Sequence, residues 1–209
     1  MLGMNRIAWV LSLALACAAN LRAEEKKPMG SVKPAGAPLE LTVSGEAKYT
    51  LDLGGKTSED YAKSIEDAKT KGGRMPAPPK VDLKLTVTNT SDQDIKIHKG
   101  GDTVVLELEL KGKGALSVAP NLAFTQEFRS PVEVELKAGK SIEFTLTALS
   151  GGFRGASKFA YWTASGDYEL VVSWKTAVNP APKGSDVSEG FGTVVVTAAP
   201  FKMTVTEKK

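Results

Sequence analysis

Few residues in this sequence could carry chemistry. The chain has one histidine, His98, and one cysteine, Cys17. A zinc site or a Ser/His/Asp arrangement needs a histidine among other ligands or beside a nucleophile. Ile95 and Ile97 share one face of a predicted strand, and His98 lies on the opposite face. This phase predicts that His98 faces solvent. Cys17 lies in a segment that we expect to be removed, so the sequence favours a protein that is not an enzyme.

The oxygen-bearing side chains also lack a catalytic or metal-binding spacing. Asn89, Asp92 and Asp94, with Asp102 nearby, could ligate calcium, but their spacing matches no EF-hand loop and such residues commonly form turns. Five glutamates alternate with apolar residues, which predicts a solvated sheet face and not the facing carboxylates of a glycosidase: Glu107, Glu109, Glu133, Glu135 and Glu143. We therefore expect neither a metal nor a cofactor.

The most distinctive stretch is Leu149–Ser165, which is rich in glycine and aromatic residues. It lacks the Lys-Ser/Thr pair of a phosphate loop, and its weak alternation predicts a loop. Tyr, Trp and Arg are enriched at binding hot spots, and flat aromatic rings can stack on sugars. We expect partner contacts here, and we also expect them from Asn121–Ser130. The alternative is that Phe159 and Tyr161 close one end of the fold while Arg154 pairs with a carboxylate. The candidate partner-binding residues are Phe153, Arg154, Phe159, Tyr161 and Trp162.

The N-terminal segment predicts export. Residues 1–23 combine Arg6, an uncharged stretch from Ile7 to Asn20 and small residues before Glu24, which is typical of a cleaved signal peptide. Cleavage after Ala19 or Ala23 fits this pattern. The alternative is a lipid anchor at Cys17, because the preceding residues resemble a relaxed bacterial lipobox. Residues 24–38 are rich in Lys, Pro, Gly and Ala and predict a flexible leader.

Charge and cysteine usage limit the partners and the compartment. Without residues 1–23, the chain carries 25 Lys and Arg against 24 Asp and Glu, a formal charge of +1. A dedicated nucleic-acid or membrane-surface binder needs a concentrated basic face, which this balance disfavours. The mature chain has no cysteine for a disulfide, whereas secreted animal proteins usually use them. We therefore expect a bacterial envelope protein, periplasmic or extracellular.

Apolar periodicity predicts an all-β domain over residues 39–209. Val81–Thr90 alternates apolar and polar residues at period two and ends in a turn cluster, as a central strand would. About ten such short strands are expected, with Trp174 on a core-facing side. One helix is expected at about residues 57–72, capped by Thr57 or Ser58 and ended by Gly72-Gly73. The predicted fold is an antiparallel, immunoglobulin-like β-sandwich with one helical insertion.

Two segments carry a family resemblance. Leu85–Ile97 resembles a strand–turn–strand unit of bacterial immunoglobulin-like domains. Gly166-Asp167-Tyr168, after Leu136–Ser141, looks like a tyrosine corner, in which the hydroxyl bonds the backbone upstream. In this order, Val81–Val178 is similar to the domain of the Bacillus intracellular proteinase inhibitor family. The whole chain also resembles conserved secreted proteins of planctomycete-type bacteria whose function is unknown.

These observations predict a non-catalytic, exported binding or structural protein. Its partner would be a protein or polysaccharide of the cell envelope, contacted through loops. The alternative, implied by the resemblance, is a proteinase inhibitor. An inhibitor presents a rigid, extended loop, and the proline-rich segment Arg74–Pro79 is the candidate for it.

Overall fold

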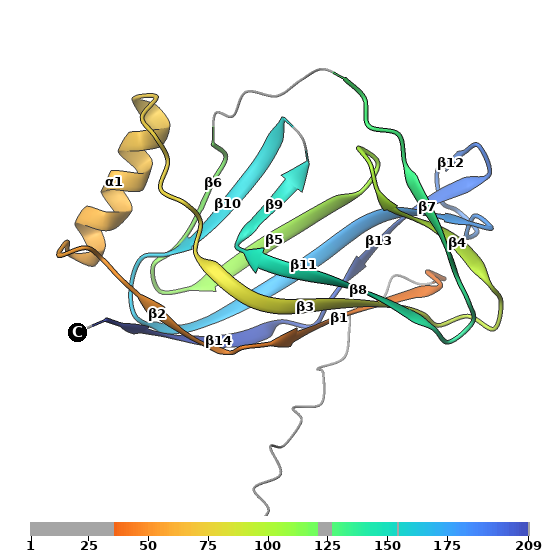
Figure 1. The fold of residues 1–209 in the computed structure, drawn as a ribbon, viewed down its shortest axis with the longest axis horizontal. Helices are drawn as coiled ribbons and strands as arrows, with labels where there is room; N and C mark the ends of the chain where they lie inside the picture. Colours follow the sequence, from red (N-terminus) through yellow and green to blue (C-terminus); the bar gives the residue numbers. More distant parts are fainter. Residues whose placement is uncertain (1–35, 121–126, 154, 209) are drawn as a thin grey trace, which may run out of the picture.

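The computed structural model describes residues 36–120, 127–153 and 155–208 (Figure 1). Several sequence predictions lie outside these residues. They are the signal peptide with Cys17, nearly all of the leader, Arg154 and part of Asn121–Ser130. The described residues form two β-sheets and one helix, which confirms the all-β prediction.

The smaller sheet has the strand order β1-β3-β8 and is antiparallel throughout. Its strands are β1 (Leu39–Gly45), β3 (Lys80–Asn89) and β8 (Ser141–Ala148). The central strand predicted from the period-two pattern of Val81–Thr90 is confirmed, because β3 lies in the middle of this sheet and buries alternate residues from Val81 to Val87. Apolar side chains at this period line one face of a pleated strand, so the other face stays in water.

The larger sheet is built around β11 (Gly166–Asn179), the longest strand. One edge of β11 pairs with β14 and β13, and the other edge pairs with β5 and β4. The sheet continues from β5 through β9 and β10 to β6, and β4 adds β7 at the opposite corner. The remaining strand bounds are β2 (Lys48–Leu51), β4 (Ile95–Gly100), β5 (Val105–Gly112), β6 (Ala115–Val118), β7 (Val132–Leu136), β9 (Ser150–Phe153), β10 (Ala156–Trp162), β12 (Val187–Ser188), β13 (Phe191–Thr197) and β14 (Phe201–Glu207).

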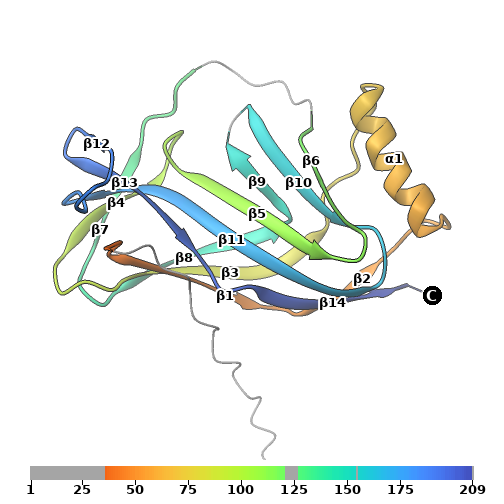
Figure 2. The same cartoon turned by 180° about the vertical axis from the view of Figure 1, so that it is seen from behind.

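The two sheets face each other across one apolar core. The smaller sheet lies in front of the larger one in Figure 1 and behind it in Figure 2. Leu83 and Leu85 of β3 belong to the same buried cluster as Leu170 and Val172 of β11. The ring of Trp174, buried as predicted, lies 5.6 Å from that of Phe144 on β8. Burial of these apolar side chains from both sheets is the main force that holds the fold together.

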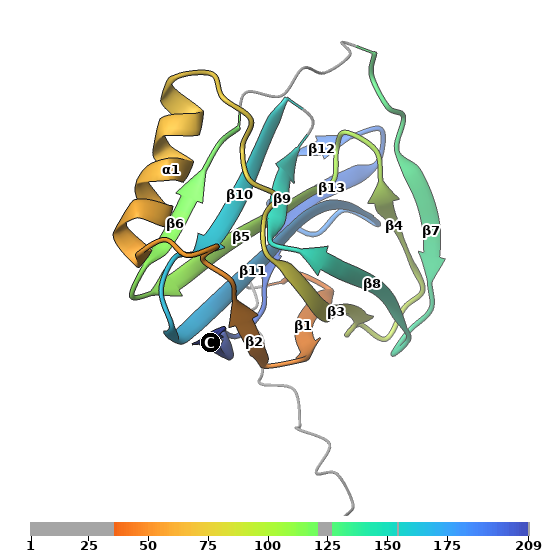
Figure 3. The same cartoon turned by 60° about the vertical axis from the view of Figure 1, so that its left-hand side comes forward.

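The predicted helix is present as α1 (Ser58–Thr70). Its N-terminus is capped by Thr57, whose hydroxyl accepts a hydrogen bond from the backbone N–H of Asp60 at 3.1 Å. Glu59 and Asp60 lie in the first turn, where carboxylates interact favourably with the helix dipole. The buried residue of the helix is Ile65, which faces β6 and β10 (Figure 3). The helix therefore adds a third layer over one end of the larger sheet.

No helix among the described residues is long and apolar enough to span a lipid bilayer.

The Gly-x-Tyr segment makes the hydrogen bond expected of it. The hydroxyl of Tyr168 lies 2.7 Å from the carbonyl oxygen of Ala164, four residues upstream, and 2.5 Å from that of Lys113. A hydroxyl has one proton, so these two carbonyls share it. Burial is the main cause that raises the pKa of Tyr168 above the usual tyrosine value. The bond ties the start of β11 to the turn between β5 and β6.

Candidate functional site

The segment predicted to be a binding loop is a β-hairpin, and this corrects the sequence prediction. Residues 150–153 form β9 and residues 156–162 form β10, paired in antiparallel register. The glycines that suggested a loop allow this pairing. A Cβ on Gly151 would lie 2.6 Å from the carbonyl oxygen of Leu106, and Gly152 has φ +89°. Glycine is therefore needed for β9 to approach β5.

The five predicted contact residues do not form one exposed surface. Tyr161 is 0% exposed and Trp162 is 3% exposed, on opposite faces of β10. Tyr161 packs against Ile65 of the helix, while the ring of Trp162 stacks on Tyr49 at 5.2 Å in the main core. Phe159 is half-buried beside Tyr161, and Arg154 lies outside the described residues. Phe153, 52% exposed, is the accessible one of the four described side chains.

The environment of Tyr161 agrees with the alternative that its ring closes one end of the fold. Its hydroxyl donates a hydrogen bond of 2.8 Å to the carbonyl oxygen of Pro76 in the proline-rich segment. Burial, with a smaller contribution from Tyr61, raises the pKa of Tyr161 to about 12. A neutral, hydrogen-bonded tyrosine under a helix stabilises the structure and offers a partner little surface.

His98 is buried and not on the solvent face, so that prediction was wrong. It is 8% exposed, its ring lies 4.4 Å from that of Phe191, and its Nδ1 lies 3.2 Å from Oγ1 of Thr103. The pairing of β4 with β7 shifts register between His98 and Gly100, and the ring of Phe191, at the start of β13, packs against the His98 ring. The alternation of Ile95 and Ile97 predicts which face of the strand carries His98, but it does not predict that Phe191 packs against this face.

The oxygen-bearing residues considered for calcium instead fix turns. The side-chain oxygen of Asn89 accepts hydrogen bonds from Ser91, and its amide donates to the carbonyl oxygens of Gln93 and Leu136. Asp94 accepts from the N–H of Ala138, and Asp102 accepts from the N–H of Arg129. Within the described ranges, no group of three or more His, Cys, Asp or Glu residues could hold a metal ion.

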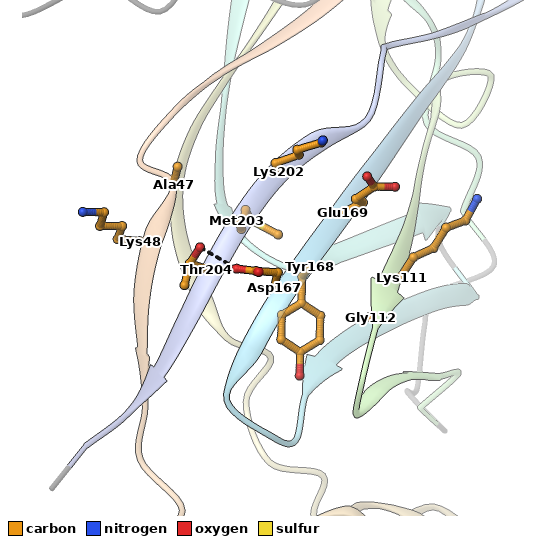
Figure 4. A pocket seen from close by; sticks show the side chains of 10 residues that line it. All are labelled: Ala47, Lys48, Lys111, Gly112, Asp167, Tyr168, Glu169, Lys202, Met203 and Thr204. Carbon is orange, nitrogen blue, oxygen red and sulfur yellow. Dashed lines mark hydrogen bonds between the residues drawn. The ribbon is translucent and has the colours of Figure 1, made fainter.

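A charged pocket lies where β2, β14, β11 and β5 run side by side (Figure 4). It has a volume of about 620 Å³ and three lysines at its rim, Lys48, Lys111 and Lys202. In Figure 4 these lysine side chains extend away from one another and not toward a common point. Glu169 stands in register between Lys202 and Lys111, and Asp167 accepts a hydrogen bond from Thr204. This alternation of charge is typical of a solvated sheet face and gives an anion no convergent donors.

A more apolar candidate for binding is a groove between β7 and β8, which we call the edge groove. It is lined by Lys99, Gly100, Val132, Val134, Ile142, Glu143 and Phe144, and its volume is about 540 Å³. The two strands leave a common turn at residues 137–140 and enter different sheets (Figure 3). Among the described strands, β7 pairs only with β4, and β8 pairs only with β3. The groove therefore has an edge strand on each side.

Four of the side chains that line the edge groove are apolar and incompletely covered, and Lys99 and Glu143 add one charge of each sign. Along β7, Leu136 beside the turn is buried, Val134 is half-buried and Val132 is 48% exposed. On β8, Ile142 and Phe144 pack against the core and remain partly exposed. Asn89 and Asp94 hold the 137–140 end of the two strands through hydrogen bonds to Leu136 and Ala138. Among the described strands, none joins β7 to β8 farther along.

The sequence contains the alternation of β7 and β8 but no signal for the groove between them. Val132, Val134, Ile142 and Phe144 occupy the apolar positions of this alternation, which shows which side chains share a face and says nothing about what covers that face. No protein-family model, no curated protein and no solved structure matches this chain.

Proposed function

We propose that the protein is a non-catalytic, exported binding or structural protein of the bacterial envelope that recognises another protein. In this proposal the fold is an immunoglobulin-like β-sandwich, supported by two sheets over one core and by the Tyr168 hydrogen bond. The predicted antiparallel pairing has one exception, because β2 and β14 run parallel. The edge groove is the observation that carries the proposal. Unpaired edge strands beside exposed apolar side chains are normally covered or blunted in proteins that stay monomeric. Here Val132 is 48% exposed between two such edges.

The chemistry of the groove favours a protein over a polysaccharide as the partner. Aliphatic side chains and free backbone edges suit an extended peptide, which adds to a sheet through main-chain hydrogen bonds. Sugar rings stack best on exposed aromatic faces. The strongly exposed aromatics among the described residues, Phe128 and Phe153, do not line the edge groove.

A capture experiment with paired variants tests the proposed function. Purified residues 24–209 would be immobilised and exposed to envelope extract, and both bound proteins and bound glycans would be identified. Val132→Lys places a charge in the groove at an exposed site. Val195→Lys is the matched control, because Val195 on β13 is similarly exposed at 44% but lies outside the groove.

We expect the natural protein and Val195→Lys to retain the same protein partner and Val132→Lys to lose it. Retention by all three would remove the edge groove as the binding surface. A glycan held by all three would identify a polysaccharide partner at another site. Capture of nothing by the natural protein would contradict a binding role and leave a structural role.

Export is the second part of this proposal and rests on the N-terminal sequence. A cleaved signal would give a mature N-terminus at Asn20 or Glu24, whereas a lipoprotein would begin at an acylated Cys17. Mass spectrometry of the N-terminal peptide from the native host distinguishes these forms. An intact Met1 in protein from the cytoplasmic fraction would contradict export.

A proteinase inhibitor is the second candidate, and one observation favours it. The proline-rich segment is held in place by the hydrogen bond from Tyr161 to Pro76 and by packing of Met75, while Arg74 is exposed. A fixed, extended segment is what an inhibitor presents to a protease. A panel of serine proteases assayed with excess protein and with the Arg74→Ala variant tests it. Unchanged rates for every protease would exclude the inhibitor function for that panel.

A further inference from the structure

We propose that the partner segment is an extended strand in which basic and aliphatic residues alternate, and that it adds to the free edge of β7. This inference rests on the proposed binding function and specifies the chemistry of the partner. It follows from the two faces of β7, which differ in character and are both accessible.

The first face of β7 defines the aliphatic half of the partner. Val132 and Val134 point into the edge groove, opposite Ile142 and Phe144 of β8. A strand paired to β7 would continue the larger sheet across this groove. Alternate side chains of that strand would then contact the same apolar floor, because strand residues two apart share a face. Small aliphatic residues fit a groove whose total volume is about 540 Å³.

The second face of β7 indicates where the partner strand would carry its basic residues. Glu133 and Glu135 alternate with the valines and are exposed. Within the part of the chain that the structure describes, neither forms an ion pair within 4.0 Å. Their neighbours on β4 are His98, in register with Glu133, and Lys96, in register with Glu135.

Three exposed glutamates on other strands do have a lysine close by: Glu143 has Lys84 at 3.1 Å, Glu109 has Lys111 at 3.4 Å and Glu107 has Lys158 at 4.0 Å. Glu169 on β11 resembles the two β7 glutamates, because it too forms no ion pair within 4.0 Å among the described residues. Opposite charges directly across two strands favour pairing, and like charges oppose it. A strand with Lys or Arg opposite Glu133 and Glu135 would supply the missing cations. An acidic strand would be repelled by the same two carboxylates.

A direct test uses two short capped peptides as probes. The first alternates lysine and valine, and the second has glutamate in place of each lysine. Binding would be measured by fluorescence anisotropy, and backbone amide shifts in NMR spectra would locate the site. The test variant is Glu133→Gln with Glu135→Gln, which keeps shape and removes charge.

The chain offers a matched control for this variant. Glu107→Gln with Glu109→Gln changes the same residue types at the same spacing on β5. Those glutamates are also exposed, but β5 is paired on both sides, with β11 and β9. General attraction between a basic peptide and surface carboxylates would respond equally to both double variants.

We expect the lysine–valine peptide to bind the natural protein and the β5 variant equally, with amide shifts concentrated on β7 and β8. Binding to the β7 variant should be about tenfold weaker, as expected for the loss of two cross-strand charge pairs. The glutamate–valine peptide should not bind. Equal weakening by both double variants, or shifts spread over other strands, would overturn the proposal.

Failure of this inference is distinguishable from failure of the proposed function. If Val132→Lys loses an envelope partner while the lysine–valine peptide does not bind, the binding function stands and the basic strand is wrong. A dimer of the natural protein that dissociates in the β7 variant, with no peptide binding, would assign this edge to a second copy of the chain. That result would also overturn the proposal.

Discussion

The two ends of the larger sheet differ in whether other elements cover their apolar side chains. β6 and β7 are both edge strands, each with apolar side chains that the two-sheet core does not cover. At the β6 end, helix α1 and the proline-rich segment lie over the sheet, and Ile65, Val118 and Tyr161 are at most 3% exposed. At the β7 end, no described element lies over the edge groove, and Val132 is 48% exposed.

The chain uses an added helix to cover one end of the larger sheet but not the other. The helix is an insertion between β2 and β3, and it buries a cluster separate from the main core. Covering an edge with a helix is a common protection against unwanted strand pairing. The absence of such a cover over β7 and β8, in the residues that the structure describes, is therefore consistent with an edge kept available for a partner.

The largest expected effect is on the covered end. Ile65→Ala should lower the free energy of unfolding by about 3 kcal/mol, because it leaves a cavity where the fully buried isoleucine side chain packs in the natural protein. Urea denaturation measures this, with the exposed Lys63→Ala as the control in the same helix. A loss below about 1 kcal/mol would mean that α1 is not firmly docked on β6 and β10.

The turn that joins the strands of the edge groove should be nearly as sensitive. Asn89→Ala should cost about 2 kcal/mol, because Asn89 is fully buried and its loss removes the side-chain donor to the carbonyl oxygen of Leu136 and one of two side-chain donors to that of Gln93. Asp94→Ala, which removes an exposed bond to Ala138, should cost clearly less in the same urea titration. Equal losses would contradict the distinction between a buried and an exposed turn bond.

The sequence predicts the parts of this fold whose signals are local. The alternation of β3, the Thr57 cap of α1, the burial of Trp174 and the hydroxyl bond of Tyr168 all follow from short-range patterns, and the structure contains each of them. Each depends on neighbours a few residues away, or on which side chains share a strand face.

The failures share the opposite cause, because they depend on what packs against an element from elsewhere in the chain. β10 alternates poorly because both its faces are covered, Tyr161 by the helix and Trp162 by the core. His98 is hidden by Phe191, which lies almost a hundred residues later in the chain. The edge groove was missed because a strand pattern is the same whether or not a neighbour pairs with it.

A smaller effect, with a distinct pH dependence, is expected at Tyr161. Tyr161→Phe should cost about 1 kcal/mol at neutral pH through loss of the hydrogen bond to Pro76. Burial raises the pKa of Tyr161 to about 12 in the folded protein, against about 10 in an unfolded chain. The unfolded state therefore ionises first, so stability from this group is present below about pH 10 and is lost as the pH rises toward 12.

The measurement for Tyr161 is the urea midpoint as a function of pH, with tyrosinate absorbance followed in parallel. The natural protein should lose stability more steeply than Tyr161→Phe between about pH 10 and 12. Some decline should remain in the variant, because burial also raises the pKa values of Tyr49, Tyr61 and Tyr168. Identical slopes would show that the Tyr161 hydroxyl is already in water in the folded state.

The smallest effect is expected on the open end, and it tests the comparison most directly. Val132→Thr replaces one methyl group with a hydroxyl and so nearly keeps the shape of the side chain. Such a replacement is costly at a covered position and nearly neutral at an exposed one. Because Val132 is 48% exposed, the free energy of unfolding should change by less than about 0.5 kcal/mol. Val118→Thr, the same change on β6 beneath the helix, should cost at least about 1 kcal/mol. If the two substitutions destabilise equally, something covers β7 in solution as well, and the edge groove is not free to receive a partner.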